Sequence, residues 1–291
     1  MAERKLPIGV QDFEKIIAEG YNYVDKTQYI VQLLKGSVYF LSRPRRFGKS
    51  LFLSTLAAYF RGQKELFKGL YLEKAEEELA RQEKREAWIE YPVLYLDFAR
   101  KEYKTKEDLL ERLALNLRNW EAIYGIAKIT DSPEEQFAYI IEQIHKLHGK
   151  QVVVLIDEYD KPLYESFGNE ELNEVYRSML RGFYSVIKSL DADIRFAFLT
   201  GITKFSKVSV FSGLNNLRDI SLLSDFAAIC GITEAELNAN FAPEIETLEK
   251  ELTQTHEELL ATLKQRYDGY LFARRGENVY NPFILLNALA A

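Results

Sequence analysis

The stretch "FLSRPRRFGKSLFL", residues 40–53, constrains the fold of this chain more than any other segment. Its Gly48-Lys49-Ser50 closes the pattern G-x-x-x-x-G-K-[ST] of a phosphate-binding loop. The opening glycine of that pattern would fall at position 43, where this chain has arginine. An apolar run before the loop predicts a strand, and helical spacing after it predicts a helix. A strand, a loop and a helix in that order are the context that the motif requires.

Apolar runs and helical patterns alternate along the rest of the first three quarters of the chain. The β-branched run in "KQVVVLIDEYD" is typical of a strand buried on both faces. Capping boxes at Thr105–Asp108 and Ser132–Glu135 predict two helix starts, with Pro133 at the first helical position of the second. We expect strands over 37–42, 91–98, 150–160 and 194–202, and further helices over 50–60, 73–90 (solvated) and 169–190. This alternation predicts an α/β fold with a mainly parallel sheet between helices.

The character of the sequence changes after residue 230. Thr233 and Glu236 form a further capping box, and a long charged helix is predicted over 243–266. The aromatic turn "YDGYLF" and a short helix after "VYNPF" follow. We therefore predict a nucleotide-binding domain over 1–228 and a small helical lid or linker domain over 229–291.

The loop offers a binding site for phosphate through its backbone. A helix N-terminus presents free N–H groups and the positive end of the helix dipole. Gly48 lets phosphate approach the backbone, Lys49 reaches the β- and γ-phosphates, and the Ser50 hydroxyl binds Mg²⁺. Arginine at position 43 removes no N–H donor, and the proline after it stiffens the loop entrance. The residues expected to contact nucleotide are Arg43, Pro44, Arg45, Arg46, Phe47, Gly48, Lys49, Ser50 and Leu51.

Polar residues that end the later strands complete the predicted site. Asp157 ends the third strand, where an aspartate holds Mg²⁺ together with Ser50 in nucleotide hydrolases. Glu158 is placed to polarise the attacking water as a general base. Thr200 ends the fourth strand and is a candidate sensor of the γ-phosphate, with Thr203 as a second candidate. Ordinary turn chemistry is the other reading of Thr200.

Arg45 and Arg46 have two readings. Either one contacts bound phosphate or reaches a neighbouring subunit's site as an arginine finger, or both are solvated or paired with nearby acids. The residues expected to take part in catalysis are Glu158, Lys49, Thr200, Arg45 and Arg46.

Together these segments resemble the AAA-ATPase-like family of bacterial proteins over residues 5 to 285. The likeness lies in "LPIGVQDFEKI", "YNYVDKT", "FLSRPRRFGKSLFLSTL", "LIDEYDKP", "FLTGITKFS", "VFSGLNNLRDIS", "YDGYLF" and "VYNPF". An arginine at the loop entrance is normal in that family, so the loop looks like a family variant. The resemblance implies a P-loop ATPase related to signal-transduction NTPases, often followed by a nuclease-like domain of the PD-(D/E)xK type. We expect that domain to be absent, because the chain ends soon after "YNPF".

The composition sets limits on the partners. A net charge of −6 and a pI near 5.4 disfavour nucleic-acid binding, although Arg43, Arg45, Arg46 and Lys204 could form a local basic patch. Asp97 and Glu102–Lys104 match D…ExK in letters, but a strand end explains Asp97 better than a nuclease site. One cysteine and no secretory or membrane-spanning apolar run favour the cytoplasm.

The leading hypothesis is therefore a Mg²⁺-dependent ATP hydrolase that acts as a signal-transduction switch. It would bind ATP, and its output would lie in a partner protein or an absent C-terminal effector domain; homo-oligomerisation stays open. The alternative is a nucleotide-binding interaction module with little or no hydrolysis. ATP is favoured over GTP because no Asn-Lys-x-Asp guanine motif is evident.

Overall fold

A five-stranded parallel sheet forms the centre of the computed structural model, which describes residues 5–202, 210–211 and 214–290. Its strands follow the order β2-β3-β4-β1-β5, and every adjacent pair is parallel. The strands are β1 (Val38–Ser42), β2 (Val93–Asp97), β3 (Val152–Asp157), β4 (Ile194–Gly201) and β5 (Arg218–Asp219). The mainly parallel α/β fold is thus confirmed, and β4 separates the strand of the GKS loop from the strand that ends in Asp157.

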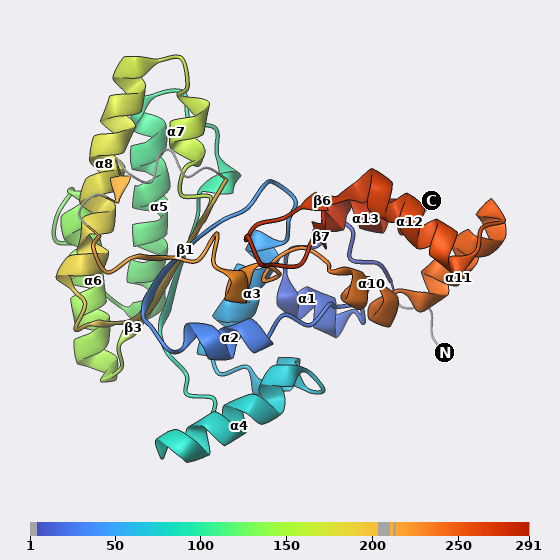
Figure 1. The fold of residues 1–291 in the computed structure, drawn as a ribbon. Coiled ribbons are helices and arrows are strands. Elements are labelled where there is room, and N and C mark those ends of the chain that lie inside the picture. Colours follow the sequence, from blue (N-terminus) through green and yellow to red (C-terminus); the bar gives the residue numbers. More distant parts are fainter. Residues whose placement is uncertain (1–4, 203–209, 212–213, 291) are drawn as a thin grey trace.

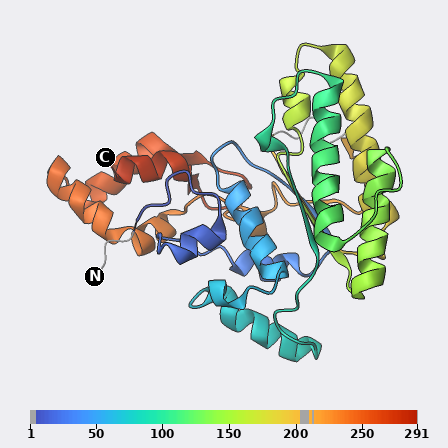
Figure 2. The same ribbon diagram turned by 180° about the vertical axis from the view of Figure 1, so that it is seen from behind.

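Helices cover both faces of this sheet (Figures 1 and 2). On β1, Val38 and Phe40 face the hydrophobic cluster that holds the buried residues of α5, α6 and α8. Tyr39 and Leu41 face the opposite cluster, which holds those of α1, α2 and α3. This alternation follows from the two-residue period of a strand. The helices of the two layers are α1 (Phe13–Ala18), α2 (Gln28–Leu33), α3 (Lys49–Phe60), α4 (Tyr71–Glu83), α5 (Lys106–Tyr124), α6 (Pro133–His148), α7 (Lys161–Glu165) and α8 (Glu170–Ser189), with short 3₁₀ turns η1 (Lys64–Phe67), η2 (Phe98–Arg100) and η3 (Ser224–Phe226).

The C-terminal helices pack around a separate hydrophobic cluster. It contains Leu237, Phe241 and Leu285, and Leu6 and Ile8 of the N-terminal segment pack against it. Both ribbon views place these helices beyond α1 and α3, away from the helices of the opposite face (Figures 1 and 2). The elements are α10 (Glu234–Asn240), α11 (Ala242–Leu252), α12 (His256–Tyr267), β6 (Asp268–Tyr270), β7 (Val279–Tyr280) and α13 (Pro282–Leu289). The domain boundary after residue 228 stays a prediction.

The predicted helix starts are largely confirmed. Both arms of the capping boxes at Thr105 and Thr233 are formed. Ser132 accepts a hydrogen bond from the Glu135 backbone N–H, but the Glu135 carboxylate instead accepts from the Thr130 hydroxyl. Only one arm of that box is therefore present.

Three helix predictions were wrong or incomplete. The helix expected over 243–266 is two helices, because Thr253 ends α11 in the left-handed conformation with φ 52°. The helix expected over 73–90 ends at Glu83, and its Glu76 is fully buried rather than solvated. Helices α1 and α2 were not predicted, since each has only six residues and a short pattern carries little periodic signal.

Among the described residues, no helix is both long and apolar enough to cross a membrane.

Candidate functional site

The GKS loop joins the C-terminal end of β1 to the N-terminus of α3. Gly48 is the N-cap of α3 and has φ 92°, a conformation that residues with a side chain rarely adopt. Apart from its chain neighbours, no atom of the described residues lies within 4 Å of a Cβ placed at Gly48. Open space therefore lies beside this backbone, at the end of a helix of twelve residues whose first N–H groups lack intrahelical partners. The loop fits the approach of a phosphate group.

Arg43 occupies the place of the missing glycine, and its side chain points into the protein. The side chain is 1% exposed, and its guanidinium donates to the backbone carbonyls of Ser221, Phe226 and Ala227 at 2.8, 2.9 and 3.4 Å. It also lies over the ring of Phe272, 4.0 Å from the centroid. The Arg43 side chain thus ties the loop entrance to later segments of the chain. A nucleotide contact by Arg43 would have to come from its backbone.

Lys49 begins α3 and turns its ammonium back toward the loop. Its Nζ donates to the carbonyl oxygens of Arg43 and Pro44, both at 2.9 Å. Burial lowers the pKa of Lys49, while the nearby charges of Asp157 and Glu158 act in the opposite direction. These bonds hold the cation over the mouth of the loop, where the sequence predicts that it meets phosphate.

The two predicted magnesium ligands lie in contact. A hydrogen bond joins the Ser50 and Asp157 side chains, and the Thr200 hydroxyl also donates to Asp157. Burial raises the pKa of Asp157, although both hydrogen bonds act to lower it. The hydroxyl of Ser50 and the carboxylate of Asp157 are oxygen ligands of the kind that Mg²⁺ takes together with substrate phosphates. The residues present therefore fit a magnesium ion.

Glu158 has a strained backbone next to this cluster. Its φ is 51°, which is uncommon for a residue with a side chain. Its backbone N–H donates to Asp157 Oδ1 at 3.1 Å and to Thr200 Oγ1 at 3.3 Å. Burial and the charge of Asp157 raise the pKa of the Glu158 carboxyl. Strain of this kind persists only where the surroundings hold it, and it is frequent at functional sites.

The segment after Glu158 fits tightly against the end of β4. The Tyr159 N–H donates to the Thr200 carbonyl at 2.9 Å. The Ile202 N–H donates to both carboxylate oxygens of Asp160, at 3.2 and 3.1 Å. A Cβ at Gly201 would lie 2.3 Å from the Tyr159 ring. The ends of β3 and β4 are thus held together without space for another atom.

The two remaining arginines of the loop are exposed. The Arg45 guanidinium lies 4.9 Å from the centroid of the Tyr164 ring, and that of Arg46 lies 4.1 Å from the centroid of Phe283. The two arginines therefore diverge, one toward α7 and the other toward α13.

Phe47 is a buried aromatic residue of the loop. Its ring packs edge-on against Tyr270 and Phe272, at centroid distances of 4.8 and 5.3 Å. The Gly231 N–H donates to the Phe47 carbonyl at 3.2 Å. The loop is therefore anchored to the C-terminal segments through a side chain that we had expected to contact nucleotide.

A pocket opens beside the loop and extends away from it. Its inner end includes Gly48–Ser50 and Glu158. Three other parts of the chain form its walls: the N-terminal segment, the turn before α2, and the C-terminal helices. The remaining lining residues are Pro7, Gly9, Val10, Gln11, Asn22, Tyr23, Val24, Lys26, Arg46, Phe47, Leu51, Phe52, Ile229, Cys230, Gly231, Ile232, Phe241, Pro282, Phe283 and Leu286. These mostly apolar walls were not predicted from the sequence; the segments "LPIGVQDF" and "YNYVDKT" were noted only as part of the family resemblance.

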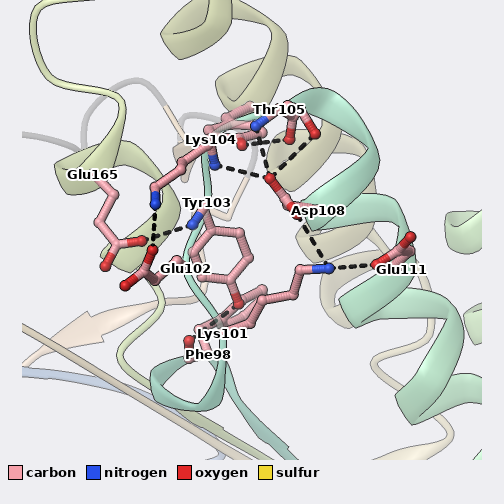
Figure 3. A network of polar contacts seen from close by, with 10 residues as sticks. Phe98, Lys101, Glu102, Tyr103, Lys104, Thr105, Asp108, Glu111 and Glu165 are labelled. Carbon is pink, nitrogen blue, oxygen red and sulfur yellow. Dashed lines mark hydrogen bonds and ion pairs between the residues drawn. The ribbon is translucent and has the colours of Figure 1, made fainter.

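The D…ExK letters around Asp97 have local partners. Asp97 accepts from the Ala99 N–H at 2.7 Å and pairs with Arg100 at 2.9 Å. Glu102 and Lys104 form an exposed ion pair at 2.6 Å. Figure 3 shows this pair within a polar network that includes the capping residues of α5. The strand-end interpretation of Asp97 agrees with these contacts.

Asp97 still bears on the site electrostatically. It is the register partner of Asp157 across β2 and β3, and its charge raises the pKa values of Asp157 and Glu158. The predicted Thr203 and Lys204 lie outside the described residues.

The two histidines of α6, His145 and His148, have separate partners. His145 lies 2.7 Å from Asp193, and the His148 ring packs edge-on against Tyr124. Within residues 5–202, 210–211 and 214–290, no three His, Cys, Asp or Glu residues gather as a metal-binding group.

Comparison with known proteins identifies relatives over nearly the whole chain. A family described as "Predicted AAA-ATPase" matches residues 7–211. A protein of Azotobacter chroococcum mcd 1, "Uncharacterized protein in vnfD 5'region", is 44% identical over 289 residues, which are 98% of this chain. The chain spans about half of that relative's length, 52%.

Two solved structures show a weak similarity of shape. They are those of Drosophila ORC bound to GC-rich DNA and Cdc6, and to AT-rich DNA and Cdc6. Each is 8% identical and the match covers 96% of this chain and 90% of the other, with TM-scores of 0.32 and 0.33. Scores this low carry no argument about function.

Proposed function

Because the chain belongs to the AAA-ATPase-like family, we propose that it binds ATP with Mg²⁺ beside the GKS loop and hydrolyses the β–γ phosphoanhydride bond. The observation that carries the proposal is the meeting of Lys49, Ser50, Asp157, Glu158 and Thr200 at the carboxyl ends of three adjacent strands. In open α/β sheets, ligands bind at this edge of the sheet.

Each of these residues has a separate role in the proposal. The N–H groups at the start of α3 and the Lys49 ammonium bind the β- and γ-phosphates, for which Lys49 would give up its bonds to the loop carbonyls. Ser50 and Asp157 would hold Mg²⁺, which neutralises phosphate charge when bound. Thr200 donates to the Asp157 carboxylate and accepts from the Glu158 N–H, so it positions that carboxylate and the Glu158 backbone.

Glu158 is the proposed general base. A water molecule attacks the γ-phosphorus, the bond from that phosphorus to the β–γ bridging oxygen breaks, and the products are ADP and phosphate. Glu158 accepts the proton that the water loses. The raised pKa of its carboxyl makes it a better proton acceptor than a free glutamate.

The apolar walls of the pocket are the proposed site of the base and ribose. They continue directly from the phosphate loop, and sites for cofactor-sized ligands are mostly apolar with a few placed polar groups. In this proposal ATP hydrolysis switches the chain between two states, as in signal-transduction NTPases. A partner protein, a further domain or another copy of the chain would bind one of these states.

A nucleotide-binding module with little hydrolysis is the second candidate. The specific observation in its favour is that Arg45 and Arg46 rest on the rings of Tyr164 and Phe283. Without an arginine at the γ-phosphate, P-loop hydrolysis is slower by about 10³-fold or more. Hydrolysis would then depend on a partner.

The experiment that separates the two candidates measures ATP turnover of the purified chain and of Glu158→Gln. Glutamine keeps the size of the side chain but removes the base, so turnover should fall by about 10² to 10⁴ while ATP affinity holds. Asp157→Asn should instead weaken Mg²⁺-dependent binding. If the parent chain binds ATP but turns it over no faster than Lys49→Ala does, the result would favour the binding module.

A further inference from the structure

Asn22 lies on a wall of the pocket formed by the turn before α2, among the lining residues that are not part of the GKS loop. It is 2% exposed and lines the same pocket as Gly48–Ser50. Its Nδ2 donates to the Asn240 carbonyl at 2.6 Å. Its Oδ1 is buried and has no hydrogen-bond partner among the described residues. Because a backbone carbonyl can only accept, this contact fixes which end of the amide carries the oxygen.

An unpartnered buried acceptor is costly. It loses the hydrogen bond that water would give it, and buried polar groups in folded proteins nearly always have a partner. The nearby Lys26 does not supply that partner, since its Nζ donates to the Ala228 carbonyl at 2.9 Å and to Glu236 at 2.6 Å. The side-chain oxygen of Asn22 is thus left able to accept a hydrogen bond from a ligand.

Resting on the proposed function, we propose that Asn22 selects adenine by accepting a hydrogen bond from the exocyclic amine of the base. Adenine presents an N–H donor at C6, whereas guanine and hypoxanthine present a carbonyl oxygen at the same position. An oxygen facing Asn22 Oδ1 would place two acceptors against each other. Sites that bond a ligand N–H discriminate strongly against an analogue that lacks it.

The position of Asn22 in the pocket agrees with a base contact. Lys49, Ser50 and Glu158 line the phosphate end of the pocket. Tyr23 and Val24, which follow Asn22 in the chain, line the same pocket, as does Phe241, which follows the bonded partner Asn240. Flat apolar surfaces of this kind suit a purine ring. Asn22 would therefore add the polar contact that fixes the orientation of the ring.

The test is a calorimetric titration with ATP, with inosine triphosphate (a 6-oxo purine) and with purine riboside triphosphate (no group at C6). The parent should bind ATP at least tenfold more tightly than either analogue. Asn22→Leu should reduce this ratio to less than threefold. Asn116→Leu, which removes a buried amide of α5 that does not line this pocket, should keep the parent's ratio.

Equal affinity of the parent for the three triphosphates would overturn the role of Asn22, as would an unchanged ratio in Asn22→Leu. In both cases the proposed function stands if Lys49→Ala abolishes binding. Failure of the parent to bind any of the three would reject the proposed function as well. Asn22→Ser, whose short side chain cannot reach the base, replaces the leucine variant if that variant does not fold.

Discussion

Arg43 is the residue whose role differs most from what its sequence position suggests. The loop pattern predicts that Arg43 contacts the nucleotide. Its guanidinium instead donates to the backbone carbonyls of Ser221, Phe226 and Ala227, about 180 residues further along the chain. Those partners are main-chain atoms, so no residue type in the sequence marks them. The strand, the loop and Lys49-Ser50 were predictable because local pattern and spacing define them.

The Arg43 contacts predict that restoring the consensus glycine destabilises the protein. Arg43→Gly leaves buried carbonyls without a donor and should lower the free energy of unfolding by about 3 kcal/mol. Arg45→Gly is the control: it makes the same change in charge and in backbone entropy as Arg43→Gly, but the side chain that it removes is exposed. Urea denaturation of both variants measures the difference. Equal loss in the two would show that the Arg43 bonds contribute nothing specific.

The burial of Asp157 should lower the stability of the folded chain at neutral pH, although the same carboxylate is proposed to bind Mg²⁺. Its pKa in the folded chain is raised above the ordinary value of 3.8, chiefly by burial. The unfolded chain therefore loses its proton first as pH rises, and the folded state loses stability from about pH 3.8 upward until its own carboxyl ionises. In metal-free buffer, Asp157→Asn should match the parent near pH 3.5 and become the more stable of the two by pH 7.

Thermal unfolding from pH 3.5 to 7 in chelator tests this prediction, with Asp225→Asn as a matched control. Asp225 lies within the 3₁₀ turn η3 and is exposed, so its substitution should leave the pH profile unchanged. A parent that gains stability relative to Asp157→Asn as pH rises would contradict the account.

At the scale of elements, the sequence predicted strands better than it predicted helix ends. The all-buried β3 and the position of β4 after α8 in the chain follow from apolar runs in the sequence. The break between α11 and α12 did not, because Thr253 carries no glycine or proline signal for its left-handed conformation. The burial of Glu76 was also not predictable from its charged span. Its carboxylate is buried because it bonds Tyr59 of α3 and pairs with Arg85, and the sequence pattern does not indicate these contacts.

The close fit between β4 and the segment after β3 predicts that Gly201 tolerates no side chain. In Gly201→Ala, the added methyl would lie 2.3 Å from the Tyr159 ring and 2.8 Å from Asp160, so the Glu158 turn must shift. Stability should fall by about 1–3 kcal/mol, and ATP turnover should fall with it.

Gly182→Ala provides the matched control for this substitution. Gly182 lies inside α8, where the nearest atom to an added Cβ is 3.9 Å away. The change should raise stability by about 1 kcal/mol and leave turnover intact. Equal loss of turnover in both variants would show that the contact between the ends of β3 and β4 is not needed to hold the Glu158 turn.

At the scale of the whole molecule, the pocket belongs to several segments that are far apart in the sequence. The N-terminal segment, the GKS loop and the C-terminal helices each supply a wall, and Leu6 and Ile8 pack against the cluster of these helices. The sequence predicted the phosphate end of this pocket through motifs, but the apolar end has no motif of its own. Phe47 of the GKS loop lines this pocket, and its ring also packs against Tyr270 and Phe272.

The measurement that tests the central claim most directly is a calorimetric titration of the purified chain with ATP, with and without Mg²⁺. The account predicts one binding site per chain, weaker binding when Mg²⁺ is removed, and loss of detectable binding in Lys49→Ala. The variant should keep the parent's circular dichroism spectrum, because Lys49 bonds only the carbonyls of its own loop. Binding of ATP by Lys49→Ala as tightly as by the parent would show that the GKS loop is not the site.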